Sequence, residues 1–133
     1  MKLTSRSEYA LLALIYLARH DGEGYVSAEH IAKEQKIPLR FLEQILLALK
    51  RARYLMSSKG QHGGFRLAKD AHEISVAEII RFFDGPLAPT ESVSQHYYES
   101  TPIETEEKLV AVFREIRDYT ARKLEETTLA DVS

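Results

Sequence analysis

Cysteine is absent from this sequence of 133 residues. The chain therefore cannot form a disulfide, a thiol nucleophile or a thiolate-held metal cluster of its own, and the absence is compatible with a reducing compartment. No segment approaches the ~20 consecutive apolar residues that span a bilayer. The first residues, Met1 to Arg6, are too polar for a signal peptide. These absences predict a soluble, cytoplasmic protein with no membrane partner.

The sequence also lacks the motifs of common enzyme classes. It has no glycine-rich phosphate loop before a helix, no cluster with metal-ligand spacing and no Ser/His/acid set with a nucleophile elbow. Its five histidines are scattered over separate predicted elements. We therefore predict no catalytic residues, no metal site and no enzymatic activity.

Charge is distributed unevenly along the chain. Residues 1–70 contain twelve Lys and Arg against seven Asp and Glu, whereas residues 71–133 contain six against thirteen. Eight of the basic residues lie between Lys36 and Lys69, with Glu43 as the single acid among them. A basic segment in an otherwise acidic protein suggests a surface for a polyanion, although an ordinary solvated face has the same charge pattern.

Apolar periodicity predicts two helices in the first 35 residues. Residues 8–20 have helical spacing, and Ser5 with Glu8 has the spacing of a capping box. A short second helix over about 28–35 is predicted to be capped by Ser27.

A third helix is predicted to begin at Pro38, whose missing N–H is tolerated in the first turn. The sequence then gives the helix two chemically different faces. One face carries Leu42, Ile45, Leu46 and Leu49, and the other face carries Leu39, Arg40, Glu43, Gln44, Lys50 and Arg51.

The period changes after this helix, where residues 54–58 and 64–68 are predicted to be two short strands. The turn between them, residues 59–63, contains glycines and Lys59. The order helix, short helix, amphipathic helix and basic hairpin predicts a mainly α fold, a winged helix-turn-helix with a small β-hairpin wing.

The second half begins with another capping-box spacing, Ser75 and Glu78, and this helix is predicted to end at Gly85. A loop over residues 86–101 follows. Thr101, Pro102 and Glu104 then have the pattern of a helix start, as cap, first residue and third residue.

The helix predicted over residues 102–126 would be roughly 37 Å long. So long a helix at the end of a small domain needs a partner for its apolar side, and a second copy of the chain is the simplest one. Residues 127–132 are predicted to form a short turn that docks back. The expected dimerisation residues are Leu109, Val112, Phe113, Ile116 and Leu124.

The third helix and the hairpin suit double-stranded DNA as a partner. The start of the helix can present Leu39, Arg40 and Gln44 to base edges in the major groove, and Lys50 and Arg51 can bind phosphates. Lys59, at the tip of the wing, can enter the minor groove.

These candidates also have simpler interpretations. Leu39 can be a core residue, Arg40 can contact phosphate or solvent alone, and Glu43 can pair with a neighbouring cation instead of accepting from a cytosine. The turn glycines Gly60 and Gly63 can serve the turn alone.

The sequence resembles the Rrf2 family of bacterial transcriptional regulators, and the resemblance extends from about Met1 to Val132. The resemblance is carried by Lys2-Leu3-Thr4-Ser5, Tyr9-Ala10, Ile31-Ala32, Phe41-Leu42-Glu43-Gln44-Ile45-Leu46, Lys59-Gly60-Gln61-His62-Gly63-Gly64-Phe65-Arg66-Leu67, Ile79-Ile80, Gly85-Pro86 and Thr127-Thr128-Leu129-Ala130-Asp131-Val132.

The resemblance implies a homodimer that binds a near-palindromic operator through a crossed long helix. It implies base contacts from Glu43 and Gln44, and DNA contacts from the N-terminal residues Thr4 and Ser5. It also implies contacts from the wing, which here carries Lys59, Gly60, Gln61 and Gly63. Lysine is a less bidentate reader than the arginine often found in relatives at position 59.

The sequence departs from cluster-binding relatives in the loop 86–101. Those relatives have three cysteines there, whereas this chain has Ser92 near the first position and Ser100 or Thr101 near the second. Serine is a poor ligand for an iron–sulfur cluster, so we predict no cluster in this chain. Either the protein naturally lacks one, or its cysteines have been replaced by serines. His96, with Glu99 or Glu104, is a weak metal candidate and is better interpreted as solvated.

The sequence thus predicts a DNA-binding domain over 1–85, a sensor-type loop over 86–101 and a dimerisation helix with a C-terminal turn over 102–133. The predicted function is a sequence-specific transcriptional regulator, with repression favoured. Its signal would arrive near the loop, from a small-molecule effector or a partner enzyme, through Ser92, His96, Ser100 and Thr101. The alternative is a winged-helix module that binds a protein instead of DNA.

Overall fold

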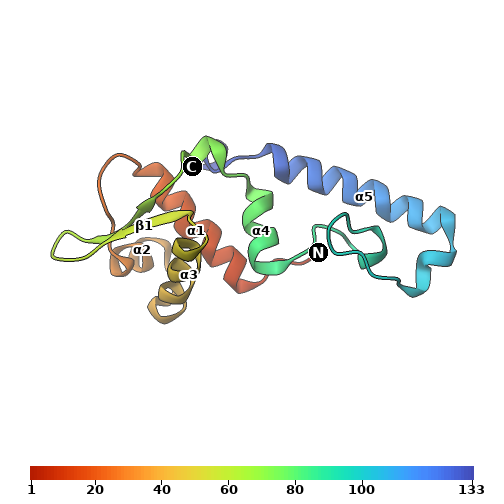
Figure 1. The fold of residues 1–133 in the computed structure, drawn as a ribbon, viewed down its shortest axis with the longest axis horizontal. Coiled ribbons are helices and arrows are strands. Elements are labelled where there is room, and N and C mark those ends of the chain that lie inside the picture. The colour runs from red at the N-terminus through yellow and green to blue at the C-terminus, as the bar shows by residue number, and fades with distance from the viewer.

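Three helices pack together at one end of the computed structural model, which describes residues 1–133 (Figure 1). Their apolar faces share one core, in which Leu14, Ile31 and Leu46 are fully buried. Burial of each such side chain contributes about 1.5–3 kcal/mol. The predicted Ser27 cap is confirmed, because the Ser27 hydroxyl accepts the His30 N–H. The three helices are α1 (Ser5–Arg19), α2 (Ala28–Gln35) and α3 (Leu39–Arg51).

The predicted start of the first helix is wrong by a few residues. Thr4, and not Ser5, is the N-cap of α1, and its hydroxyl accepts the Ser7 N–H at 3.3 Å. Both residues have a hydroxyl, so their local sequence does not distinguish them. A distant side chain, Asp84, contacts Thr4 and fixes it as the cap. Pro38 likewise precedes α3 as its N-cap residue instead of being its first helical residue.

The hairpin is confirmed as β1 (Leu55–Ser58) paired antiparallel with β2 (Gly64–Leu67), and it projects from the helices as a wing (Figure 1). Val26, before α2, adds an antiparallel bridge to Phe65 through two backbone hydrogen bonds of 2.9 and 2.8 Å. This bridge ties the wing to the helix-turn-helix and thereby sets the wing's direction.

Helix α4 (Val76–Asp84) packs on α1 and begins with the predicted capping box, which is confirmed. The Ser75 hydroxyl accepts the Glu78 N–H, and the Glu78 carboxylate accepts the Ser75 N–H. The same carboxylate accepts the Tyr54 hydroxyl at 2.7 Å. Burial, together with this hydrogen bond, raises the pKa of Tyr54 to about 12. The bond joins the start of the wing to α4.

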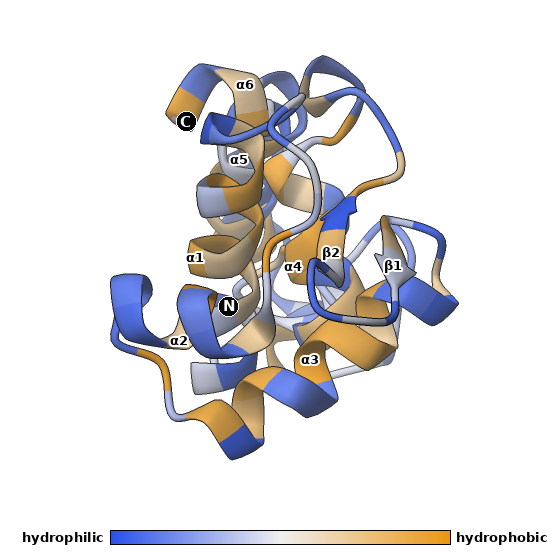
Figure 2. Ribbon diagram, turned by 90° about the vertical axis from the view of Figure 1, so that its left-hand side faces the viewer, coloured by the Kyte–Doolittle hydropathy of each residue, from blue (hydrophilic) through white to orange (hydrophobic).

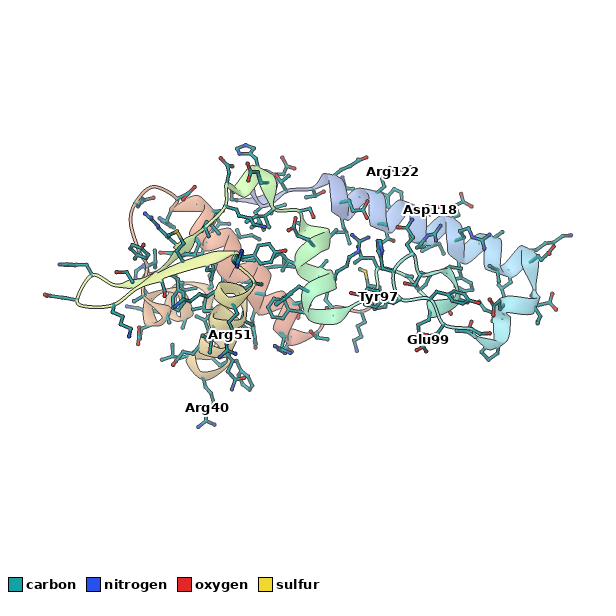
Figure 3. The ribbon with its side chains drawn as sticks, in the orientation of Figure 1. Arg40, Arg51, Tyr97, Glu99, Asp118 and Arg122 are labelled. Atoms are coloured by element: carbon teal, nitrogen blue, oxygen red, sulfur yellow. The ribbon has the colours of Figure 1, made fainter.

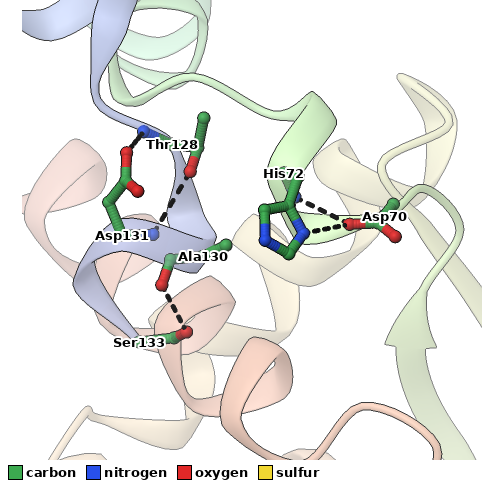
Figure 4. Close-up of polar contacts among 6 residues, drawn as sticks. All are labelled: Asp70, His72, Thr128, Ala130, Asp131 and Ser133. Atoms are coloured by element: carbon green, nitrogen blue, oxygen red, sulfur yellow. Dashed lines mark hydrogen bonds and ion pairs between the residues drawn. The ribbon is translucent and has the colours of Figure 1, made fainter.

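The C-terminal turn docks back as expected. It forms α6 (Leu129–Val132), whose Leu129 is fully buried in the core of the first domain. Figure 4 shows the capping box of Thr128 and Asp131 beside the short turn η1 (Ala71–Glu73), where Asp70 accepts two hydrogen bonds from His72. The chain thus returns from the far end of the molecule to its own N-terminal domain.

The predicted start of the long helix is wrong. Residues Pro102–Thr105 form a separate 3-10 turn, η3, and α5 spans Glu107–Glu126. Its 20 residues give a length of about 30 Å. Thr101 caps no helix, because its hydroxyl donates to the Ser92 Oγ at 2.8 Å. The loop before α5 therefore includes a second short turn, η2 (Glu91–Val93), and continues to residue 106.

No helix is both long enough and apolar enough to cross a lipid bilayer.

Candidate nucleic-acid interface

The side of helix α3 that faces away from the core carries both polar and apolar residues. Its ribbon alternates between hydrophobic and hydrophilic residues, and the arginine at its start points away from the body of the protein (Figures 2 and 3). Leu42, Ile45, Leu46 and Leu49 are buried on the other side, as predicted. The exposed residues of this helix are Leu39, Arg40, Phe41, Glu43, Gln44, Leu47, Lys50 and Arg51.

Arg40, Glu43, Gln44 and Leu47 define the outer face of α3. The major groove of B-DNA is wide enough to admit an α-helix. Arg40 and Gln44 are one turn apart and can both reach base edges. Leu39 lies at the border of this face with 36% of its surface exposed, so it is not the core residue of the simpler interpretation.

Sequence reasoning missed two exposed apolar side chains on α3. Phe41 is 54% exposed and Leu47 is 44% exposed. The available signal was their position, since both fall outside the buried spacing of residues 42, 45, 46 and 49. An apolar group at a groove-facing position suits the methyl group of thymine.

The wing presents Lys59, Gly60 and Gln61 at its exposed tip. The two turn glycines have different structural reasons. Gly60 has a φ of +103°, whereas a Cβ at Gly63 would lie 2.3 Å from the Ser58 carbonyl oxygen. Both glycines are therefore required by the turn, and any contact with DNA adds to that requirement.

The wing carries a second cation that sequence reasoning did not single out. The Arg66 guanidinium lies 4.7 Å above the ring of Tyr25. This contact holds an exposed positive charge between β2 and the segment before α2, where it is available to a phosphate. The predicted phosphate residues Lys50 and Arg51 lie at the other end of α3 and are exposed.

The N-terminal residues Thr4 and Ser5 lie at the start of α1, next to the outer face of α3. Ser5, Arg6 and Tyr9 line a shallow hollow together with Phe41 and Gln44. The side chain of Ser5 is exposed.

The polar atoms of Thr4 are engaged within the protein. Its N–H and its hydroxyl both donate to Asp84. Thr4 thus helps to place Ser5 and Arg6 beside Phe41 and Gln44 of α3.

Hydroxyl groups form a hydrogen-bonded network in the loop 86–101. The Thr101 hydroxyl donates to the Ser92 Oγ at 2.8 Å, and the Thr90 hydroxyl donates to Thr101 at 3.3 Å. Ser92 is buried. Three neutral hydroxyls do not supply the thiolate ligands that an iron–sulfur cluster requires, so these residues do not fit such a cluster.

A second group of contacts forms around Glu104 at the end of this loop. Hydrogen bonds from Ser100 and Tyr98 lower the pKa of the Glu104 carboxyl. His96 is exposed and does not join this group (Figure 3 shows its neighbours Tyr97 and Glu99). No three His, Cys, Asp or Glu side chains are placed to hold a metal ion.

The predicted apolar side of α5 is divided between two faces. Phe113 packs against the buried cluster of Ala88, Val93 and Val110, and Leu124 packs against a second cluster under α4. These two residues are partly buried against their own chain, and their role in a dimer stays a prediction. The helical spacing of the sequence groups Phe113 and Leu124 with the other apolar residues of α5. Their contacts with the loop and with the cluster under α4 are visible only in the tertiary structure. The exposed apolar residues are Leu109, Val112, Ile116 and Tyr119.

The loop and α5 are joined by an arginine that sequence reasoning missed. The Arg117 guanidinium donates to the Val93 carbonyl oxygen at 2.7 Å and pairs with Asp118. Arg81 of α4 pairs with Glu125 of α5 at 2.6 Å. The loop, α4 and α5 are thus connected by polar as well as apolar contacts.

Residues 3–133 match the Rrf2 family, described as iron-dependent transcriptional regulators. The HTH-type transcriptional regulator CymR of Bacillus subtilis is 31% identical over 133 residues, which cover all of this chain and 90% of that protein. A protein of Mycobacterium tuberculosis (strain H37Rv) named as an HTH-type transcriptional regulator is 36% identical over 133 residues, covering 81% of that protein.

Solved structures agree with the sequence comparisons. The structure of CymR, the global cysteine regulator of B. subtilis, superposes with a TM-score of 0.80 at 30% identity and covers 99% of this chain and 95% of that one. The structure of T. potens IscR has a TM-score of 0.77 at 28% identity, with 99% of this chain and 85% of that one covered.

Proposed function

The chain belongs to the Rrf2 family and is a DNA-binding transcriptional regulator rather than an enzyme; from this premise we propose that it acts as a homodimer that represses transcription from a near-palindromic operator. The observation that carries the proposal is that the outer face of α3 and the tip of the wing are both open, with Arg40, Gln44 and Lys59 all exposed. In a two-fold dimer each half-site receives one α3 and one wing, so a near-palindromic operator is expected.

In this proposal α3 reads the sequence and the wing adds affinity. Arg40 can pair with guanine, Gln44 with adenine, and Glu43 can accept from a cytosine amino group. Lys59 and Arg66 bind phosphates or enter the minor groove, and Lys50 and Arg51 add phosphate contacts. The exposed stripe of α5 supports the dimer, because four large apolar side chains in a row otherwise face water.

The loop 86–101 is proposed to receive the signal without an iron–sulfur cluster. Its hydroxyl network and the Arg117 contact with Val93 connect it to α5. A small molecule or a partner protein that changes this network would thereby reach the dimer helix. The alternative, a winged-helix module for a protein partner, has no use for cations on both α3 and the wing.

Fluorescence anisotropy of the purified protein on DNA from upstream of its own gene tests the proposal. We expect tight binding that weakens steeply as salt rises and that scrambled competitor DNA does not displace, because phosphate contacts supply affinity and base contacts supply selectivity. Binding that is equally weak on scrambled DNA would instead favour the protein-interaction module.

Two substitutions are expected to separate the roles of α3 and the wing. Lys59→Ala should weaken binding to all sequences alike and reduce the salt slope by about one. Gln44→Ala should cost about 1–3 kcal/mol on the operator and relax selectivity at one base pair of each half-site.

Anisotropy on a set of single-base operator variants measures both effects. Arg122→Ala on α5 is the control, because Arg122 is exposed and lies far from the wing (Figure 3). If Lys59→Ala changed base selectivity and Gln44→Ala did not, the assignment of the two roles would be reversed.

A further inference from the structure

The last residue of α4 holds the first turn of α1, although the two are almost 80 residues apart in sequence. The Asp84 carboxylate accepts the Thr4 N–H at 3.2 Å, the Thr4 hydroxyl at 2.5 Å and the Ser7 hydroxyl at 2.6 Å. Ser7 is fully buried. Asp84 therefore occupies the position that an anion takes at the N-terminus of a helix.

The charge of Asp84 is maintained by these contacts. Partial burial raises the pKa of its carboxyl, but the hydrogen bonds from Ser7 and Thr4, with the nearby Arg6 guanidinium, lower it overall. Asp84 is thus ionised at neutral pH, and its hydrogen bonds are the stronger, charge-assisted kind.

The residues that follow Asp84 in sequence enter the loop 86–101. Leu87 and Ala88, three and four residues after Asp84, are both buried. The Ala88 carbonyl oxygen accepts a hydrogen bond from the Met1 amino group at 3.1 Å. Figure 1 shows the N-terminus beside this loop. The N-terminal residues are therefore attached both to Asp84 and to the loop that follows it.

The residues that follow Thr4 in sequence lie beside the proposed DNA-binding face of α3. Ser5 and Arg6 follow Thr4 directly and border Phe41 and Gln44 of α3. A shift of the first turn of α1 therefore changes the surface beside the outer face of α3.

We propose that Asp84 is a positioning residue that couples the loop 86–101 to the DNA-facing start of α1. With the carboxylate in place, Ser5 and Arg6 are held beside α3 and the DNA-binding surface is complete. A signal that moves the loop carries Asp84 away through Leu87 and Ala88, frees the first turn of α1 and weakens DNA binding. This inference rests on the proposed DNA-binding function.

The substitution Asp84→Asn tests the inference because two explanations predict opposite signs. Removal of a negative charge near a DNA-binding surface strengthens DNA binding if Asp84 acts through its charge alone. If Asp84 positions α1, the loss of charge-assisted hydrogen bonds weakens operator binding instead, by about tenfold. Asp131→Asn is the matched control, since it removes the same charge from another capping residue, in the C-terminal turn.

Hydrogen exchange provides a second readout on the same full-length proteins. In Asp84→Asn we expect faster exchange at residues 5–8, with the amides of α3 and the wing unchanged. In addition, Ser5→Ala should weaken operator binding in the wild-type background and have no further effect together with Asp84→Asn. Ser7→Ala, which removes one of the three donors, should show the same changes at smaller size. It replaces Asp84→Asn as the test variant if Asp84→Asn does not fold.

Two outcomes overturn the inference. If Asp84→Asn bound the operator as well as or better than the wild type, with unchanged exchange at residues 5–8, Asp84 would not position α1, and the proposed DNA-binding function would stand. If the wild-type protein itself failed to select the operator, the proposed function would fall first and this inference with it.

Discussion

Replacement of Val112 and Ile116 by glutamate is expected to convert the protein to a monomer and to weaken operator binding by at least about 100-fold. Val112 is 52% exposed and Ile116 46% exposed, on the same side of α5 as Leu109 and Tyr119. Two buried carboxylates at the centre of a dimer interface would have no partner charge. A monomer then binds one half-site without the effective concentration that its linked copy provides, which is worth about 10²–10⁴.

Size-exclusion chromatography with light scattering measures the oligomeric state, and anisotropy measures operator affinity. Ala111→Glu is the matched control, because Ala111 is exposed on the polar side of the same helix. The α5 residues Val110 and Phe113 face the protein's own loop, so the double variant should retain its helical circular dichroism. A double variant that remained dimeric and kept its operator affinity would show that the dimer uses another surface.

The largest effect on stability is expected for Gly64→Ala. Gly64 has a φ of +146°, and a Cβ there would lie 2.2 Å from the Val26 carbonyl oxygen. The substitution therefore combines an unfavourable backbone conformation with a clash against the backbone that bridges to Phe65. We expect the free energy of unfolding to fall by about 3 kcal/mol or more.

Urea denaturation followed by circular dichroism measures this loss. Gly60→Ala is the control, since Gly60 also has a positive φ, of +103°, but no atom lies within 4 Å of a Cβ at that position. Strain alone should cost about 1 kcal/mol there. Equal losses in the two variants would show that backbone strain, and not the close approach of Val26, makes Gly64 necessary.

Local patterns in the sequence determined most of the elements at the DNA-binding end. The apolar spacing of Leu42, Ile45, Leu46 and Leu49 identified the buried face of α3, and by exclusion its outer face. The Ser75–Glu78 capping box placed the start of α4 correctly. These signals are local, because a helix period or a cap depends on residues within about one turn of each other.

The exposed apolar residues of α3 show where the same reasoning stops. Phe41 and Leu47 are apolar, but their helical angle places them outside the core. The angle was available from the sequence. The sequence alone does not show whether another element covers that side of α3, and the structure shows that both side chains are exposed.

The tertiary structure decided the starts of α1 and α5 and the two faces of α5. Thr4 became the cap of α1 because Asp84 reaches it from the end of α4, and Thr101 did not cap α5 because its hydroxyl donates to Ser92. Phe113 and Leu124 pack against their own chain because apolar residues of the loop and of α4 lie next to them. Each outcome depends on a partner more than two helical turns away in sequence, so the local pattern around the residue does not identify that partner. The sequence therefore established the helices, the wing and their basic surface, whereas long-range contacts alone established how the N-terminus, the loop and α5 are joined.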